Sequence, residues 1–305
     1  MFPAISICIP AYKQPENLKR LLESIEIQTF RDFEVIITDD SPNDCLNNVI
    51  AANWSFTISH FRNEKSLGSP GNWNAGIGRA TGSWIKLMHH DDWFEYSYSL
   101  QRFIDATIAH QNKKFFFCKT WIFNTCTNEK FLYQPVLFRY EAVENCPANL
   151  FHANVIGAPT TTFIHRDIKE LYDENLIWLV DIEYYYRLIC KYGIVKIEEP
   201  LISTAEEQVH QLTTKLKDNK EVELKEFFYC YEKLTPIFNR TNHLIFRERI
   251  LFLLQHYNVQ RISEIRNSGF NGNIPLFVKL FYFLRKLNKK LAIQIVGKWL
   301  QILLK

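Results

Sequence analysis

Residues 5–41 read ISICIPAYKQPENLKRLLESIEIQTFRDFEVIITDDS, and this stretch decides the fold class. The apolar run Ile5–Ile9 predicts a short buried strand that Pro10 ends, and Phe33–Thr38 predicts a second strand. Between them, Pro15 suits the first turn of a helix. That helix has four apolar residues on one face: Leu18, Leu21, Leu22 and Ile25. A strand, a helix and a strand in this order predict an α/β fold with a parallel sheet.

The alternation continues along the chain and then changes to helix alone. Further strands are predicted at 56–61, 84–88, 115–123, 130–138, 159–165 and 195–203, and helices at 72–80 and 180–192. After about Thr214 the pattern is helical only, at 218–234, 242–256 and 275–304. We therefore expect a mostly parallel sheet flanked by helices over residues 1–215. A C-terminal helical region would follow over residues 216–305.

Composition and charge exclude several classes of protein. With 47% apolar and 23% charged residues, the chain is neither disordered nor fibrous. Its net charge is +3, but residues 275–305 hold seven basic and no acidic residues. The rest of the chain has 29 basic and 33 acidic residues, a charge of −4. A mildly acidic body disfavours nucleic-acid binding, and the basic C-terminal segment requires its own explanation.

The cysteines and the hydropathy pattern predict a cytoplasmic protein. There are seven cysteines, an odd number, and no pair has C-x-x-C spacing. Free thiols of this kind are typical of a reducing compartment. The N-terminal apolar run is too short for a signal peptide, and no run of about 18 uncharged apolar residues predicts a membrane-spanning helix.

Two acidic pairs stand directly after predicted strands. Asp39-Asp40 follow the strand at 33–38, and Asp91-Asp92 follow the strand at 84–88. Ligands of open α/β sheets bind outside the carboxyl ends of the strands. Two adjacent carboxylates repel each other unless they are solvated or bound to a cation. The pairs therefore predict a ligand or metal site, although each could instead cap the following helix.

Two segments resemble the family 2 glycosyltransferases, which have the GT-A fold. Residues 5–41 are similar to the family's first strand, P-x-Y turn, first helix and second strand ending in D-D. Residues 63–93, NEKSLGSPGNWNAGIGRATGSWIKLMHHDDW, are similar to the segment that ends in the family's D-x-D motif. The resemblance runs from about Ile5 to Thr213. It implies a GT-A fold for the first two thirds of the chain.

The resemblance implies donor-binding roles at the strand ends. Asp39 and Asp40 would hold the nucleotide base and ribose, and Pro10, Ala11 and Tyr12 would line the base. Other candidate donor contacts are His89, His90, Asp92 and Asn74. His89 stands where the family has the first Asp of D-x-D and would replace it by hydrogen bonding. The two histidines could instead be plain polar loop residues, and Asn74 could be a helix cap.

The same resemblance implies a bound divalent metal. Asp91 matches the metal-binding Asp of D-x-D. The leaving nucleoside diphosphate carries about two to three negative charges, which a hard cation with oxygen ligands neutralises. Mg²⁺ or Mn²⁺ fits such a site, and one histidine ligand favours Mn²⁺. That ligand would be His210, because residues 206–213 resemble the family's H-x-x-S/T element; otherwise His210 is a polar loop residue.

The residues at 178–188, WLVDIEYYYRL, resemble the family's E-D-x-x-x-x-x-R-L motif. Asp181 matches the Asp that acts as general base, and Val180 replaces the preceding Glu. On residue chemistry alone Glu183 competes for that role, because the two acids point to different faces of the helix. Asp181 could also be a helix N-cap.

Together these patterns predict an inverting glycosyltransferase with a nucleotide-sugar donor, most simply a UDP-sugar. The acceptor would be a glycan or a lipid-linked sugar in bacterial O-antigen or capsule assembly. Two alternatives stay open at this point. One is a catalytically inactive protein that binds sugar nucleotides. The other is a sugar nucleotidyltransferase, although the chain lacks the G-x-G-x-R-x-x-P-x-x-K loop typical of that class.

The basic C-terminal segment predicts an amphipathic helix at an anionic membrane surface. In residues 275–291 the predicted apolar stripe consists of Phe277, Leu280, Leu284, Leu287 and Leu291. Lys279, Lys286 and Lys290 lie on a neighbouring face. This pattern is typical of an interfacial helix and would place the protein peripherally on the inner face of the cytoplasmic membrane. Alternatively, the helix packs on the protein with its lysines in solvent.

Overall fold

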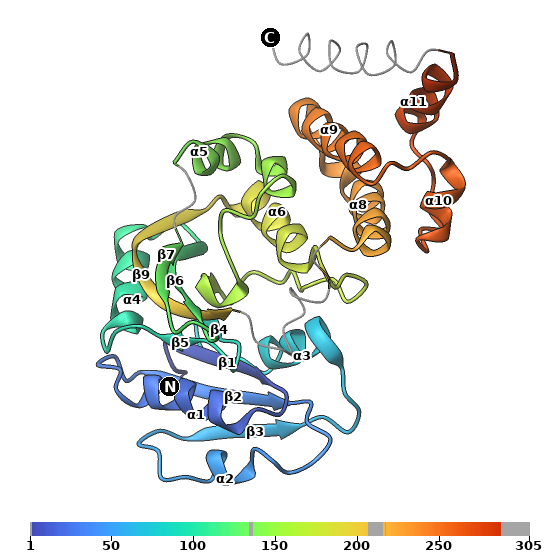
Figure 1. Cartoon of the computed structure of the whole chain (residues 1–305). Coiled ribbons are helices and arrows are strands. Elements are labelled where there is room, and N and C mark those ends of the chain that lie inside the picture. The colour runs from blue at the N-terminus through green and yellow to red at the C-terminus, as the bar shows by residue number, and fades with distance from the viewer. Residues whose placement is uncertain (1, 134–136, 207–215, 217, 288–305) are drawn as a thin grey trace. The chain divides into compact units, whose positions relative to one another are not determined.

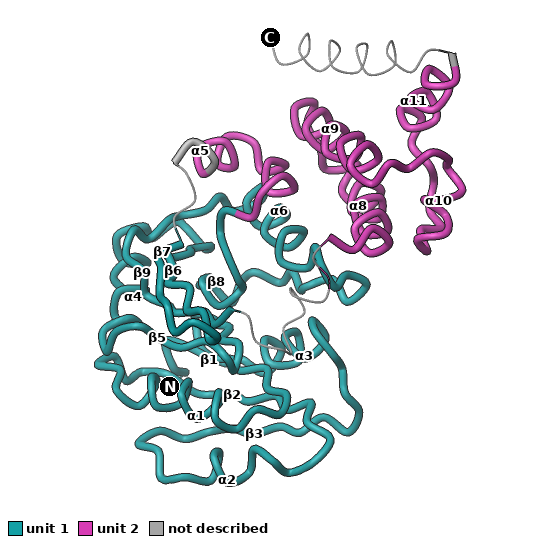
Figure 2. Tube along the Cα trace, viewed as in Figure 1, with its two compact units in different colours: residues 1–137, 155–214 teal, residues 138–154, 215–305 magenta. Residues whose placement is uncertain are grey.

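The computed structural model describes residues 2–133, 137–206, 216 and 218–287. The chain divides into two compact units (Figure 2). Unit 1 consists of residues 1–137 and 155–214, and unit 2 of residues 138–154 and 215–305. Each unit has its own core.

Unit 1 is built on one nine-stranded sheet (Figure 1). Its strands are β1 Ile5–Ala11, β2 Phe33–Asp39, β3 Ile58–Arg62, β4 Trp84–Leu87, β5 Trp93–Phe94, β6 Phe115–Asn124, β7 Lys130–Tyr133, β8 Thr162–His165 and β9 Val195–Glu206. The order is β3-β2-β1-β4-β8-β6-β9-β5, and β7 pairs with β6. Strands β1–β4, β6 and β9 run in one direction, and β5, β7 and β8 run against them. The predicted mostly parallel sheet is confirmed.

Helices flank the sheet and complete its core. They are α1 Pro15–Glu26, α2 Asn47–Ile50, α3 Gly68–Ile77, α4 Ser99–Ala109 and α6 Val180–Tyr192, with a 3₁₀ turn, η2, at Pro159–Thr161. Helix α3 packs on β1 and β2, whereas α4 packs on β9 and α6 on β6. The predicted apolar face of α1, which includes Leu18 and Leu22, is fully buried. Burial of this face stabilises the helix on the sheet.

The strand register brings three loops to one edge of the sheet. Ala11 of β1 pairs with Asp39 of β2, and Cys8 pairs with Leu87 of β4. The carboxyl ends of β1, β2 and β4 are therefore neighbours. Asn72 of α3 fixes this edge, because its buried amide donates to the carbonyls of Thr38 at 2.9 Å and Ala11 at 3.4 Å.

Unit 2 is helical among its described residues. It consists of α5 Leu137–Asn145, whose first residue belongs to unit 1, and of η1 Pro147–Phe151, α8 Lys220–Leu234, η3 Thr235–Ile237, α9 Arg240–His256, α10 Ile262–Asn267 and α11 Leu276–Leu287. Its core has packed aromatic rings, with the centroids of Phe151 and Phe246 4.2 Å apart. Buried Asn242 joins η1 to α9 by accepting from Cys146 Sγ and the Ala148 amide. No helix in the described part of the chain is both long enough and apolar enough to span a membrane.

Two predicted elements differ from the structure, and several observed elements have no predicted counterpart. The strand predicted at 130–138 ends at Tyr133, and helix α5 begins at Leu137. The sequence of α5, LFRYEAVEN, contains several good helix formers, so the apolar run was wrongly continued into it. Helices α2, α4 and α10 and the two-residue strand β5 have no counterpart among the predicted elements. The helix predicted at 275–304 is described only as far as Leu287, and its remainder lies outside the described residues.

Candidate active site

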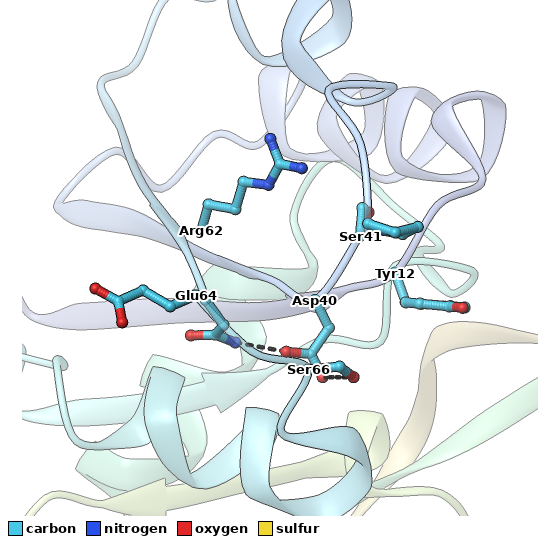
Figure 3. A pocket seen from close by; sticks show the side chains of 8 residues that line it. Tyr12, Asp40, Ser41, Arg62, Glu64 and Ser66 are labelled. Carbon is cyan, nitrogen blue, oxygen red and sulfur yellow. Dashed lines mark hydrogen bonds between the residues drawn. The ribbon is translucent and has the colours of Figure 1, made fainter.

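A pocket of about 620 Å³ lies at the carboxyl ends of β1 and β2 (Figure 3). Its lining residues come from three segments, one at the end of each of β1, β2 and β3: Tyr12, Asp40, Ser41, Pro42, Arg62, Asn63, Glu64 and Ser66. Asp40 lies in the middle of the group, with Tyr12 on one side and Arg62 and Glu64 on the other. Tyr12 is half exposed, so its ring offers a flat surface to a ligand.

The two acids after β2 have different environments. Asp39 is buried, accepts from the Ser41 amide at 2.8 Å and lies 3.3 Å from His60 Nε2. The Asp40 carboxylate accepts four hydrogen bonds from the loop after β3. Its donors are Asn63 Nδ2 at 2.7 Å, Ser66 Oγ at 3.1 Å, Leu67 N at 3.1 Å and Gly68 N at 2.8 Å. Asp40 therefore holds the pocket's own wall in place, besides lining the pocket.

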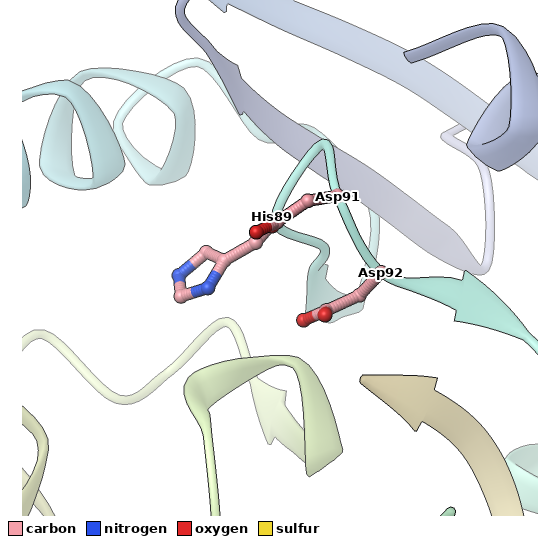
Figure 4. A group of neighbouring side chains, drawn as sticks. All are labelled: His89, Asp91 and Asp92. Atoms are coloured by element: carbon pink, nitrogen blue, oxygen red, sulfur yellow. The ribbon is translucent and has the colours of Figure 1, made fainter. Parts of the chain in front are cut away.

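The turn between β4 and β5 brings together a possible metal-binding group (Figure 4). His89, Asp91 and Asp92 each offer one ligand atom, and these atoms lie within 4.8 Å of one another. Their side chains project to the same side of the turn. An imidazole and two carboxylates are ligands that Mn²⁺ accepts, and the carboxylates also suit Mg²⁺.

Burial favours the neutral form of both histidines of this turn. Burial lowers the pKa of His89 to about 4, against the opposing effect of Asp91. Its Nε2 atom is buried and has no hydrogen-bond partner among the described residues. The ring packs on Trp73 with a centroid distance of 4.8 Å. Burial likewise lowers the pKa of His90, which lies near Asp91, the Pro10 carbonyl and Asp39. A neutral imidazole is the form that binds a metal.

Asp92 is the most constrained acid of the group. It is buried, and its carboxylate accepts from Thr160 Oγ1 at 2.5 Å and the Ala205 amide at 3.2 Å. Burial and the neighbouring Asp91 charge raise the pKa of Asp92 well above its usual range, although these hydrogen bonds act against that shift. A cation beside the two acids would favour their charged forms.

Arg20 of α1 holds the same turn from the helix side. Its Nη2 donates to the Asp91 carbonyl at 2.6 Å, and its guanidinium lies 4.0 Å from the centre of the Trp93 ring. Burial lowers the pKa of Arg20, and the charges of Asp91 and Asp92 act to raise it. The backbone of Asp91 is therefore fixed, and its carboxylate lies in the group with His89 and Asp92.

The two predicted base candidates on α6 are clearly distinguished. Glu183 is fully buried and forms a two-pronged ion pair with Arg187, at 2.7 and 2.9 Å. Asp181 is partly exposed, and its carboxylate accepts from the Ile182 amide at 2.8 Å. The N-cap position belongs to Leu179, so Asp181 lies inside the first turn.

The other residues predicted to bind the donor or the metal do not all lie at the pocket. Pro10 and Ala11 are buried at the end of β1, and Ala11 O accepts from the Asp40 amide at 3.0 Å. The amide of Asn74 instead connects α3 to residues 172–174, through Tyr172 and Glu174. The prediction for His210 lies outside the described residues.

Sequence reasoning missed several residues that the fold places here: Arg20, Arg62, Glu64, Ser66, Lys86 and Thr160. The polar loop 63–66 belongs to the segment that resembles the family, but its sequence alone indicates no contact with Asp40. Thr160 lies 68 residues from Asp92, and no local pattern connects them.

Comparison with known proteins identifies a family. A model described as Glycosyl transferase family 2 matches residues 6–170. An uncharacterized glycosyltransferase of Methanocaldococcus jannaschii is 26% identical over 210 residues, which cover 66% of this chain and 70% of the relative. The GalNAc(5)-diNAcBac-PP-undecaprenol beta-1,3-glucosyltransferase of Campylobacter jejuni is 29% identical over 93 residues, 30% of each chain. The match likewise spans only 30% of an uncharacterized glycosyltransferase of Haemophilus influenzae.

Solved structures show the same fold at low sequence identity. TarS residues 1–349 of S. aureus, in complex with UDP-GlcNAc, align with a TM-score of 0.64 at 16% identity, covering 99% of this chain and 84% of that one. The mannosyltransferase of Pyrobaculum calidifontis, in complex with GDP-Man and Mn²⁺, aligns with a TM-score of 0.59 at 12% identity and the same coverage.

Proposed function

The chain belongs to glycosyl transferase family 2, and on this premise we propose that it transfers a sugar from a nucleotide-sugar donor to an acceptor hydroxyl. The observation that carries the proposal is the grouping of His89, Asp91 and Asp92 at the sheet edge where the Asp40 pocket also lies. The pocket suits a nucleoside, and the acidic group suits a cation beside its diphosphate.

We propose UDP as the nucleotide. The S. aureus neighbour solved with UDP-GlcNAc supports this choice. Tyr12 would stack on the base, and Asp39, Asp40 and the Ala11 turn would line the base and ribose. The sugar would be a hexose or an N-acetylhexosamine.

The donor set at the β4–β5 turn fits Mn²⁺ or Mg²⁺. Two carboxylates and an unpartnered buried imidazole nitrogen are grouped there, and one imidazole favours Mn²⁺. His89, Asp91 and Asp92 would hold the ion, with His210 as a further predicted ligand. When bound, such a cation neutralises the charge of the leaving diphosphate. The Pyrobaculum neighbour solved with Mn²⁺ supports the choice of metal.

Asp181 is proposed as the general base. Its carboxylate would accept the proton of the acceptor hydroxyl, and the oxygen would form a bond to the anomeric carbon. The bond from that carbon to the diphosphate oxygen would break on the opposite face, so the anomeric configuration would invert. Glu183 is less suited to this step, because Arg187 already occupies both of its carboxylate oxygens.

Nucleotide titration tests this proposal. UDP should bind the wild-type protein more tightly with Mn²⁺ than with EDTA, and Asp91→Ala should remove that difference. Asp105→Ala is the matched control, because Asp105 is an exposed acid on α4. If no nucleotide binds, or if Asp91→Ala keeps the full effect of Mn²⁺, the proposed donor site is wrong.

We also propose that the protein works at an anionic membrane surface on lipid-linked acceptors in bacterial O-antigen or capsule assembly. The printed name of the Campylobacter relative, which includes undecaprenol, supports a lipid-linked acceptor. The support from the fold is helix α11. Its exposed apolar residues are Leu276 (80% exposed), Leu280 (48%) and Phe283 (58%), which lie within about 60° at 100° per residue. Lys279 and Lys286 are exposed beside them.

The exposed apolar face differs from the predicted stripe. Phe277 packs on Tyr231 with a ring-centroid distance of 5.5 Å and lies under Arg247, so it faces the core of unit 2. The buried face of α11 contains Val278, Phe281 and Tyr282. Of the predicted stripe, Leu280 is therefore exposed, Phe277 faces the core, and Leu291 lies outside the described residues.

Sedimentation with vesicles tests the membrane proposal. Wild-type protein should bind phosphatidylglycerol vesicles in low salt, and each lysine removed, at Lys279 or Lys286, should weaken binding about fivefold, equivalent to about 1 kcal/mol. Replacing Leu276, Leu280 and Phe283 together by serine should abolish binding. Ile108→Ser, at an exposed apolar site in unit 1, is the control. Equal binding by all variants, or equal binding to phosphatidylcholine, would reject the proposal.

A further inference from the structure

The hydroxyl of Thr160 forms hydrogen bonds with both ends of the His89–Asp92 turn between β4 and β5. Thr160 is fully buried in η2, and its hydroxyl donates to Asp92 Oδ2 at 2.5 Å. The same hydroxyl oxygen accepts from the His89 amide at 3.3 Å. One hydroxyl therefore connects both ends of the His89–Asp92 turn, in addition to the backbone bond from Asp92 N to His89 O at 3.1 Å.

Thr160 is itself anchored by a buried lysine. Lys86 of β4 is fully buried, and its ammonium group donates to the carbonyl of Thr160 and, at 3.2 Å, to that of Thr162. It also lies 4.6 Å from the centre of the Phe103 ring. A buried ammonium group is costly unless its donors are satisfied, and Thr160 of η2 and Thr162 of β8 supply the acceptors. Lys86 thus explains why η2 stays against the end of β4.

We propose that Thr160 is a positioning residue for the metal-binding group, held in place by Lys86. This inference rests on the proposed function, because it assigns Thr160 to the metal site proposed there. Asp92 can turn about its side-chain bonds, and a neighbouring like charge on Asp91 favours turning away. The Thr160 hydroxyl and the Ala205 amide fix both oxygens of Asp92, so its carboxylate stays with His89 and Asp91.

Hydrogen bonds to a ligating carboxylate orient it, and their loss costs metal affinity about 10–100-fold. Thr160→Val keeps the shape of the side chain and removes only the hydroxyl. We therefore expect that variant to bind Mn²⁺ about 10–100-fold more weakly. Thr160→Ser should restore affinity close to that of the wild type, because it retains the hydroxyl. Thr161→Val is the matched control: Thr161 is equally buried in η2, but its hydroxyl bonds the carbonyls of Ile156 and Ala158.

The experiment measures Mn²⁺ binding by electron paramagnetic resonance, with and without UDP, and compares thermal unfolding of each variant. Weak Mn²⁺ binding by a folded Thr160→Val, with rescue by Thr160→Ser and no change in Thr161→Val, supports the proposal. If Thr160→Val does not fold, Thr160→Ala replaces it in the same comparison. If the hydroxyl-free variant keeps the Mn²⁺ affinity of the wild type while Asp91→Ala loses it, the proposed role of Thr160 is wrong and the proposed metal site stands. A wild-type protein that binds no Mn²⁺ under either condition overturns the metal site as well.

Discussion

Asp40→Asn tests whether Asp40 holds the pocket wall. The change keeps the size of the side chain and replaces one acceptor oxygen by a donor group. Oδ1 accepts from Asn63 and Leu67, and Oδ2 accepts from Ser66 and Gly68. Whichever oxygen is replaced, two of the four donors lose their acceptor.

The expected magnitude follows from that count. A hydrogen bond to a charged group contributes about 1.5–3 kcal/mol, so two lost bonds should destabilise the fold by about 3–6 kcal/mol. Asp40 is only 7% exposed, so water cannot fully replace those bonds. Such a loss is a large part of a typical unfolding free energy of about 5–15 kcal/mol.

Urea unfolding followed by fluorescence gives the measurement. Asp44→Asn is the matched control, because Asp44 lies in the loop after β2 and forms a largely exposed ion pair with Arg62. Exposed pairs of this kind contribute about 0–1 kcal/mol. If the two variants unfold within about 1 kcal/mol of each other, Asp40 does not hold the wall. Nucleotide affinity should fall in Asp40→Asn as well.

Three other predictions each concern one carboxylate. Asp181→Asn should reduce sugar transfer about 10²–10⁴-fold with little change in donor affinity, measured by initial rates and titration. Glu183→Gln should instead lower the unfolding free energy by about 1.5–3 kcal/mol, because Arg187 loses a charged acceptor; the opposite pattern would reassign the base. At Glu34, burial acts to raise the pKa, but hydrogen bonds from Ser6, Thr81 and Gly82 lower it overall. The folded pKa is then below the unfolded one, so stability should decline as pH falls below about 4.5. Glu34→Gln should remove part of that decline in acid-unfolding curves, and an unchanged pH profile would refute the assignment.

Local patterns were sufficient to predict much of unit 1. Strands β1 and β2 are runs of apolar residues that end at Ala11 and Asp39, close to the predicted ends. Helix α6 was predicted with its observed bounds, since its apolar face begins at Val180 and Gly193 ends it. The strand-end acids also lie where the α/β pattern puts them, at one sheet edge. These features depend on neighbours in the sequence, which is why the sequence reveals them.

Features that depend on distant contacts were not predictable. Nothing near Asp40 in the sequence indicates that four donors from residues 63–68 would occupy it. The contact between Thr160 and Asp92 requires β8 to lie antiparallel beside β4, a topology that no local pattern encodes. Residues 138–154 belong to unit 2 because η1 packs on α9.

Release of UDP from a panel of UDP-sugars tests the central claim most directly. In Mn²⁺, wild-type protein should release UDP from at least one donor, and the rate should rise with a suitable glycan or lipid-linked acceptor. EDTA and Asp91→Ala should each abolish that release, whereas Asp105→Ala should not. Full turnover in EDTA would contradict the metal-assisted mechanism. Failure to turn over any nucleotide-sugar, by a protein that still binds UDP, would contradict the assignment as a glycosyltransferase and favour an inactive binding protein.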